Sequence, residues 1–317
     1  PNVQVWYSNK ESCRFSQIKH LLKEIKPDVI YLNGLFTPAF VFLPLLVRKI
    51  LTDDAARWVM APRGMLQQGA LSVKPLKKKF YLGIFKLLGL HRAIHWHATD
   101  EQEVIDIAKV FGQLAKVTLA FDTPQLISPP FFPIRKKVAS VNLLFISLIT
   151  AKKNIKKLFI ALQQVKQDIQ VKITVYGPIK DAVYWQECQK EIKKMPSHVH
   201  YEYLGEISPN QVTQVLQQSH FFVLPTLGEN FGHAIYESFH AGRPVIITDK
   251  TPWRNLQQYP AGWDYPSEQM EILPELIEKA AQMDQETFDQ YCEGARQVAV
   301  QYIEKNDFLT QYKALFE

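Results

Sequence analysis

Short apolar runs alternate with stretches of helical period along most of this chain. In the first half, runs typical of buried strands cover residues 3–7, 29–32, 58–61, 94–98 and 117–121. Between them, apolar residues recur at helical spacing over residues 16–25, 37–49, 77–88 and 101–110. This alternation predicts an α/β fold built on parallel sheets, because a helix after each strand returns the chain to the same edge.

The pattern breaks once and then restarts. Residues 128–140 are rich in proline and basic side chains and show no period, which indicates a linker between domains. After it, strands are predicted at residues 143–149, 171–176, 199–203, 221–224 and 245–247. We therefore expect a first domain at 1–135, a second at 136–300 and a C-terminal segment at 301–317.

Residues 221–248 carry the clearest chemical signal. The apolar residues 221–224 predict a strand, a helix is expected over 234–241, and Gly242 stands where a left-handed cap ends such a helix. The loop between strand and helix lies at the carboxyl end of the sheet. The first N–H groups of the helix, near residues 231–234, are then expected to form a site for an anion.

Two carboxylates flank that helix start. Glu229 stands in the loop and Glu237 in the second helical turn, while Gly232 lets a ligand approach the backbone. A phosphate at the helix start, with carboxylates to accept hydrogen bonds from hydroxyl groups, is what a sugar nucleotide requires. The spacing alone is also typical of a solvated helix face, so it leaves both interpretations open.

The surrounding residues favour a sugar-nucleotide site over a solvated helix face. The run Glu-Asn-Phe-Gly-His-Ala-Ile-Tyr-Glu at 229–237, followed by Ala-Gly-Arg-Pro-Val-Ile and by Asp-Lys-Thr-Pro-Trp at 249–253, resembles the E-x7-E motif of glycosyltransferase family 4. That family includes bacterial polysaccharide transferases. The resemblance implies a GT-B fold, in which two Rossmann-like domains face each other across a cleft. It also implies that the last helix, at 308–316, returns to the first domain.

The implied activity is transfer of a hexose-type sugar, with retention at the anomeric carbon, from a nucleotide-diphosphate donor to a saccharide or lipid-linked acceptor in surface polysaccharide biosynthesis. The nucleotide sugar is a co-substrate, and neither a cofactor nor a metal is expected. By resemblance, Glu229 contacts the transferred sugar and Glu237 the ribose. Further donor-binding residues are Asn230, Phe231, Gly232, His233, Gly177, Pro178 and Glu206. The alternative interpretation of Gly177-Pro178 is that the pair simply ends a strand.

The expected phosphate-binding segment departs from the family pattern. Members of the family usually carry an Arg and a Lys five residues apart after the first strand of the C-terminal domain. Here Lys153 occupies the Lys position, but Leu148 stands where the Arg is expected. Two hypotheses follow. Either Lys153, the helix start and another cation suffice for catalysis, or the chain is a weak or silent nucleotide-sugar-binding protein.

Two loops of the first domain follow buried strands and are expected on the acceptor side, at Asn33, Gly34 and Gly64. Arg63 stands where many relatives carry a His. Because an Arg does not exchange its proton near neutral pH, we expect Arg63 to bind the donor phosphate or an anionic acceptor, or to be a solvated loop residue. The strand and glycine-containing loop that usually open the family fold are not recognisable before Val3, so we expect the first domain to lack its initial portion.

Composition and charge limit the compartment and the binding partners that we expect for this protein. No apolar run has the length of a bilayer span, and three well-separated cysteines are typical of reduced thiols, so we expect a cytoplasmic protein, or one peripheral to the inner face of the plasma membrane. The net charge is +6, and one basic cluster at 74–79 precedes aromatic residues at 80–85. That segment suggests contact with an anionic membrane. Nucleic-acid binding is not expected, since the aromatic residues do not interleave with the basic clusters.

Overall fold

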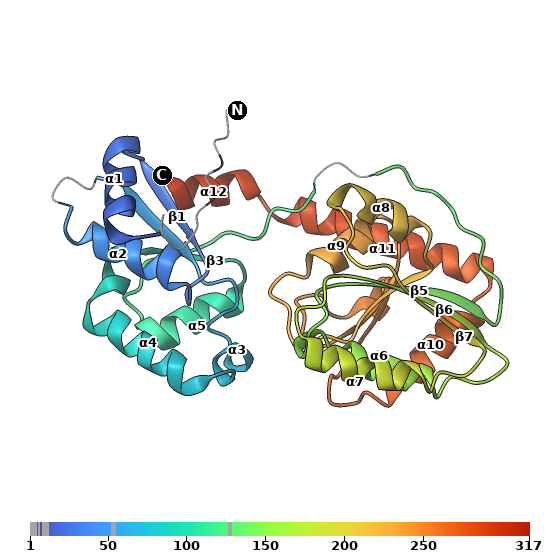
Figure 1. Cartoon of the computed structure of the whole chain (residues 1–317). Coiled ribbons are helices and arrows are strands. Elements are labelled where there is room, and N and C mark those ends of the chain that lie inside the picture. The colour runs from blue at the N-terminus through green and yellow to red at the C-terminus, as the bar shows by residue number, and fades with distance from the viewer. Residues whose placement is uncertain (1–4, 6, 8–12, 52–54, 126–128) are drawn as a thin grey trace. The chain divides into compact units, whose positions relative to one another are not determined.

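The computed structural model describes residues 5, 7, 13–51, 55–125 and 129–317, and most of the predicted strand at 3–7 lies outside them. The chain forms two units, one of residues 1–122 with 307–317 and one of residues 123–306 (Figure 1).

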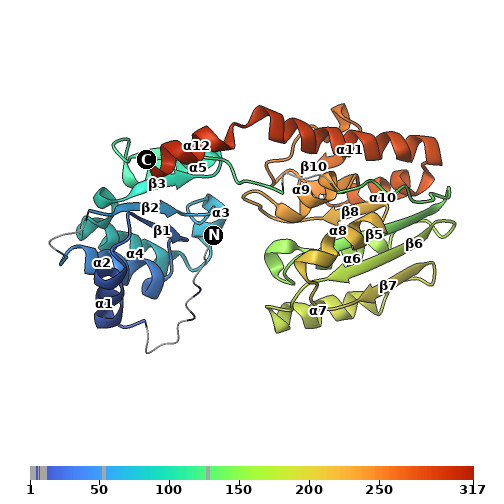
Figure 2. The same ribbon diagram turned by 90° about the horizontal axis from the view of Figure 1, so that it is seen from above.

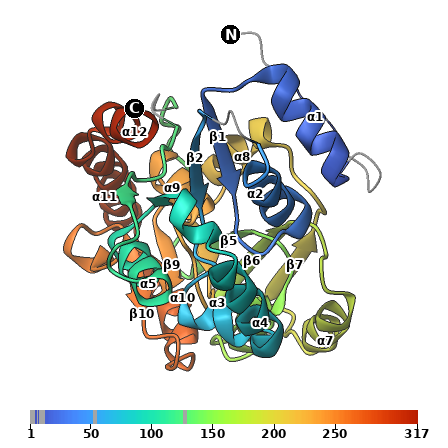
Figure 3. The same ribbon diagram turned by 90° about the vertical axis from the view of Figure 1, so that its left-hand side faces the viewer.

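Among its described residues, the first unit contains a four-stranded parallel sheet in the order β1-β2-β3-β4. Its strands are β1 (Val29–Asn33), β2 (Arg57–Ala61), β3 (His95–Ala98) and β4 (Val117–Leu119). Its helices are α1 (Phe15–Ile25), α2 (Leu43–Arg48), α3 (Gln68–Ser72), α4 (Pro75–Leu87) and α5 (Glu101–Phe111), with a π-helical turn at Pro38–Phe42 before α2. Figure 3 shows α1 and α2 side by side. The two central strands, β2 and β3, are buried along almost their whole length, as is typical of parallel strands covered by helices, whereas β1 and β4 at the edges are only partly buried.

The C-terminal helix α12 (Phe308–Phe316) belongs to this first unit. Leu315 is fully buried against Val59 and Ala120, and the Phe121 N–H donates to the side-chain oxygen of Gln311 at 3.0 Å.

The second unit is built on a six-stranded parallel sheet in the order β10-β9-β8-β5-β6-β7. Its strands are β5 (Ser140–Ile146), β6 (Gln170–Tyr176), β7 (Val199–Tyr203), β8 (Phe221–Leu224), β9 (Val245–Thr248) and β10 (Gly262–Tyr265). Its α-helices are α6 (Ile155–Leu162), α7 (Ala182–Ile192), α8 (Pro209–Gln217), α9 (His233–His240), α10 (Ile272–Gln282) and α11 (Gln285–Lys305). Helices α6, α7 and α10 cover one face, and α8, α9 and α11 cover the other (Figures 1 and 2).

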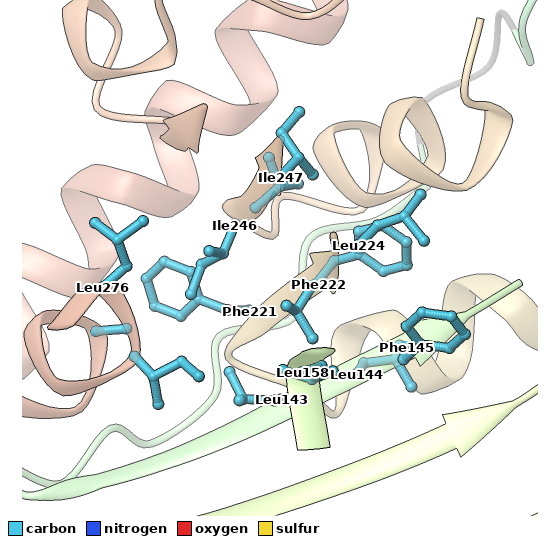
Figure 4. Close-up of a cluster of buried hydrophobic side chains, with 14 of the residues drawn as sticks. Leu143, Leu144, Phe145, Leu158, Phe221, Phe222, Leu224, Ile246, Ile247 and Leu276 are labelled. Atoms are coloured by element: carbon cyan, nitrogen blue, oxygen red, sulfur yellow. The ribbon is translucent and has the colours of Figure 1, made fainter. Parts of the chain in front are cut away.

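The core of the second unit explains why its strands are short apolar runs. Phe145, Phe221 and Phe222 are fully buried, and they pack with Leu158 of α6 and Leu276 of α10 (Figure 4). Helices on both faces leave no solvated side of the central strands, so their sequences do not alternate between apolar and polar residues.

The unit boundaries differ from the predicted ones, and packing gives the reason. Phe131 and Ile134 lie against the core of the second unit, and the buried Arg243 donates to the Phe132 carbonyl at 2.7 Å. The proline-rich segment therefore belongs to the second unit, whose first residue is Thr123 rather than residue 136. At the other end, α11 runs past residue 300, because Tyr302 packs among aromatic side chains of this unit.

Candidate functional site

The loops after β5 and β8 meet where the strand order of the second sheet reverses. From β5 the chain adds β6 and β7 on one side, then returns to add β8, β9 and β10 on the other. Open α/β sheets bind ligands outside the carboxyl ends of their strands at such a switch point. The two loops are joined by a hydrogen bond from the Leu227 N–H to the Lys152 carbonyl at 2.8 Å.

An ion pair occupies this edge of the sheet. Lys153, after β5, donates to the Glu229 carboxylate, after β8. Both side chains are largely buried, at 17% and 11% exposure. Lys152 lies beside them, and burial lowers its pKa although Glu229 acts in the opposite direction. The structure thus brings together Lys153, predicted to bind phosphate, and Glu229, predicted to contact the transferred sugar, and adds Lys152 beside them.

The start of α9 lies next to Glu229. Gly232 precedes the helix with a φ of +79°, and a Cβ there would lie 2.9 Å from Ile235 Cδ1 and 3.6 Å from Glu229 Cγ. A side chain at residue 232 is therefore disfavoured by both backbone conformation and space. The Ile235 and Tyr236 N–H groups bond to the Gly232 carbonyl, so those of His233 and Ala234 are the donors that the first helical turn directs outward.

The side chains around this helix start differ in burial, as Glu237, Phe231 and His233 show. Glu237 is half-buried in the second turn of α9, and burial raises the pKa of its carboxyl group. Phe231 is buried, and its carbonyl accepts the indole N–H of Trp253 at 2.7 Å. The His233 side chain is exposed, with its ring centroid 4.8 Å from that of Phe231. The predicted donor-binding segment therefore has a fixed backbone and an exposed outer face.

The turn at Gly177 and Pro178 touches the same edge. A Cβ on Gly177 would lie 1.8 Å from the Ser147 carbonyl oxygen, and φ there is +138°, so only glycine fits. The Ile149 N–H donates to the Pro178 carbonyl at 3.0 Å, which ties the turn to the loop after β5. Leu148 lies between these bonded residues and is 46% exposed.

Glu206 follows the neighbouring strand β7 and has an exposed side chain. It comes directly after Gly205, whose carbonyl accepts the Gly177 N–H at 2.7 Å. Glu206 thus belongs to the same group of loops as Gly177.

Arg63 in the first unit is part of a polar network. Its guanidinium pairs with Asp122 and donates to Asn33 Oδ1 at 3.2 Å and to Tyr31 Oη at 3.1 Å. Burial alone would lower the pKa of Arg63, but Asp122 and Tyr31 raise it above its usual value. The alternative of a solvated loop residue is therefore wrong, although 30% of the side chain remains exposed.

A buried carboxylate that was not predicted as a site residue holds the same loop. Glu103 is fully buried and accepts the Gly64 N–H at 2.6 Å and both the N–H and the hydroxyl of Thr99 at 2.9 Å. Next to the Gly64 loop, the Gly34 N–H donates to the Ala61 carbonyl at 2.8 Å. The predicted acceptor-side residues are thus held by hydrogen bonds within the first unit.

Within the described ranges, no group of three or more His, Cys, Asp or Glu side chains is arranged to hold a metal ion. None of the helices described by the structure is long and apolar enough to cross a membrane.

The family is decided by a sequence model described as "Glycosyl transferases group 1", which matches residues 131–297, more than half of the chain. The chain belongs to this family. Comparison with curated protein sequences finds no match. The matched residues of this group 1 glycosyltransferase include the whole edge formed by the loops after β5, β6, β7 and β8.

Several solved structures resemble this chain in fold. TarM from S. aureus matches with a TM-score of 0.69 and 14% identity, over 96% of this chain and 58% of TarM. Anabaena HepE, in complex with UDP and glucose, matches with a TM-score of 0.68 and 14% identity, over 95% and 80% of the two chains. WaaG matches with a TM-score of 0.63 and 15% identity, over 95% and 94%. The prediction of a GT-B fold with two Rossmann-like domains is confirmed.

Proposed function

We propose that this chain transfers a hexose-type sugar, with retention, from a nucleoside-diphosphate donor to a saccharide or lipid-linked acceptor, as a member of glycosyltransferase family 4. The observation that carries the proposal is the Lys153–Glu229 pair beside the start of α9, at the switch point of the second sheet. HepE, which has a similar fold, was crystallised with UDP and with UDP-glucose, and WaaG is involved in lipopolysaccharide biosynthesis. These neighbours favour a nucleotide-sugar donor and a role in surface polysaccharide synthesis.

In the proposed reaction, the bond between the anomeric carbon and the β-phosphate oxygen breaks, and its electron pair leaves with the nucleoside diphosphate. The acceptor hydroxyl forms the new bond on the same face of the sugar, and its proton passes to the departing phosphate oxygen. Lys153 and the N–H groups of His233 and Ala234 stabilise the negative charge on the leaving group.

The two carboxylates orient the donor in this proposal. Glu229 accepts hydrogen bonds from hydroxyl groups of the transferred sugar, and Glu237 accepts them from the ribose. Before the donor binds, Lys153 neutralises Glu229; once a diphosphate is present, Lys153 is shared between the carboxylate and the phosphate. Asn230, Phe231 and Gly232 contribute backbone groups, and Gly177, Pro178 and Glu206 lie toward the base.

A catalytically silent nucleotide-sugar-binding protein is the second candidate. Leu148 favours it, because this exposed apolar side chain offers no hydrogen bond where family members usually place a phosphate-binding Arg.

Release of nucleoside diphosphate from a panel of sugar nucleotides separates the two candidates. The proposed transferase releases it, and Glu229→Ala and Glu237→Ala each slow the release by on the order of 100-fold. A protein that binds a sugar nucleotide but releases no diphosphate in the presence of acceptors is the silent candidate. Proton NMR of the product then reports whether the anomeric configuration is retained.

A further inference from the structure

Helix α4 presents two apolar faces, of which the part of the chain described by the structure covers one and leaves the other exposed. On the covered face, Phe85 is fully buried and stacks on the ring of Tyr81, with centroids 5.9 Å apart. The Tyr81 hydroxyl donates to the Leu35 carbonyl at 2.8 Å, which fixes the helix to the first unit. The orientation of α4 about its axis is thus set by its buried side.

The opposite face carries a row of large apolar side chains. Leu76, Phe80 and Leu87 are 82%, 72% and 86% exposed. With Gly83 they follow a spacing of four, three and four residues, which places them in one stripe along the helix. Single exposed apolar residues are common on protein surfaces, but an aligned row of them marks an interaction surface.

Lysines surround this stripe without acidic neighbours in the sequence. Lys74, Lys77, Lys79 and Lys86 all have exposed side chains. Between Asp54 and Asp100 the chain contains no aspartate or glutamate, although acidic residues are nearly as numerous as basic ones overall, at 31 against 37. The positive charge is therefore concentrated where the apolar row is exposed.

We propose that this face of α4, formed by Leu76, Phe80 and Leu87 with the four lysines, lies on an anionic lipid bilayer. An amphipathic helix of this kind places its apolar side chains below the lipid headgroups while its lysines contact anionic phosphates. A nucleic acid also offers phosphates, but it would leave the apolar row in water. The residues of this surface belong to the first unit and those of the proposed sugar-nucleotide site to the second, so the proposal does not depend on the proposed reaction.

Sedimentation of the full chain with lipid vesicles tests the proposal. We expect the protein to bind phosphatidylcholine vesicles that contain phosphatidylglycerol, to bind pure phosphatidylcholine weakly, and to dissociate at high salt. Lys77→Glu with Lys79→Glu, and separately Leu76→Ser with Phe80→Ser, should each lower the partition coefficient by about 10-fold or more.

Matched variants elsewhere provide the controls. Leu114→Ser removes an equally exposed leucine (98%), and Lys190→Glu with Lys193→Glu makes the same change of charge on exposed lysines of the second unit. Both should leave vesicle binding unchanged, and circular dichroism should show every variant folded. Binding that is insensitive to the α4 variants, or equally lowered by the controls, would overturn the proposal. So would binding to single-stranded RNA that the lysine variants abolish and the Leu76 and Phe80 variants leave intact.

Discussion

At the scale of single residues, the charge balance around Glu229 is the central feature of the candidate site. Two lysines from the loop after β5, Lys152 and Lys153, face one carboxylate from the loop after β8. Lys152 has an exposed side chain, whereas Lys153 and Glu229 are largely buried, so the excess of positive charge faces solvent and suits a ligand that brings negative charge of its own. A diphosphate satisfies that requirement, since it leaves Glu229 free to accept hydrogen bonds from sugar hydroxyls.

Replacing Lys153 by methionine should therefore weaken both binding and catalysis. We expect the rate of nucleoside-diphosphate release to fall by on the order of 100-fold, because one fixed charge at the leaving group is lost. Lys157→Met, which changes an exposed lysine of α6, is the matched control and should retain the wild-type rate. Equal rates in Lys153→Met and the control would remove Lys153 from the mechanism.

Leu148 provides a second test at this scale. Under the proposed function, Lys153 and the start of α9 already stabilise the leaving group, so Leu148→Arg should change turnover by less than about 10-fold. If the site were impaired by the missing Arg, restoring this side chain would raise turnover by on the order of 100-fold or more. Steady-state release of nucleoside diphosphate distinguishes the two outcomes.

At the scale of elements, most strands follow from the apolar pattern alone. Strand β6 is predicted to within one residue, and β8 is predicted without error, because both are bounded by Gly, Pro or polar residues. Strand β10 was missed: Gly262 to Tyr265 reads Gly-Trp-Asp-Tyr, which has no apolar run, and the strand exists through pairing with β9. Both predicted bounds of β5 (143–149) were also wrong: the strand runs from Ser140 to Ile146, and the Ser147 N–H beyond its end donates to the Tyr176 carbonyl.

The candidate site could be predicted only in part from the sequence, for a related reason. The motif around Glu229 and Glu237 signals its own local structure, and Lys153 follows from resemblance. The contacts of Arg63 with Tyr31 and Asp122 join residues far apart in sequence, as do those of Glu103 with Gly64. No local sequence pattern predicts these contacts, because they depend on how neighbouring strands end at one edge of the sheet.

Arg243 shows how one side chain joins several elements. It is fully buried and donates to the carbonyls of Phe132 and Gln217 at 2.7 Å and of Gly242 at 2.9 Å. Arg243→Met leaves these carbonyls without their donor, so we expect the free energy of unfolding of the second unit to fall by about 3 kcal/mol or more.

Chemical denaturation monitored by tryptophan fluorescence measures the effect of Arg243→Met. Arg135→Met, on an exposed arginine of the same proline-rich segment, should change the stability by less than about 0.5 kcal/mol. A similar loss in both variants would show that Arg243 does not hold the segment.

At the scale of the whole molecule, acid stability should depend on a buried histidine. Nδ1 of His220 accepts the Asn142 N–H at 2.8 Å and Nε2 donates to the Arg135 carbonyl at 2.9 Å, so the ring is neutral. Burial lowers the pKa of His220 to about 4. Between pH 6.5 and 4 the unfolded chain binds the extra proton and the folded chain does not, so stability falls as the pH falls through this window.

We expect the titration of His220 to lower the free energy of unfolding by about 3 kcal/mol as the pH falls from 6.5 to 4. His220→Gln, which keeps a donor and an acceptor but does not titrate, should lack this part of the pH dependence. The difference in free energy of unfolding between the wild type and the variant, measured from pH 7 to pH 4, isolates the histidine from the other titrating groups. A difference that stays constant across this range would contradict the assignment.

The proposed function requires that the second unit bind a sugar nucleotide at the edge formed by the loops after β5 and β8. The most direct test is a thermal-shift screen of sugar nucleotides and free nucleoside diphosphates, because it requires no acceptor and ranks donors. We predict that one class of nucleotide sugar raises the melting temperature, and that Lys153→Met and Glu237→Gln reduce the shift while Lys157→Met preserves it. No shift with any nucleotide, or a shift that all three variants retain, would contradict the proposed site.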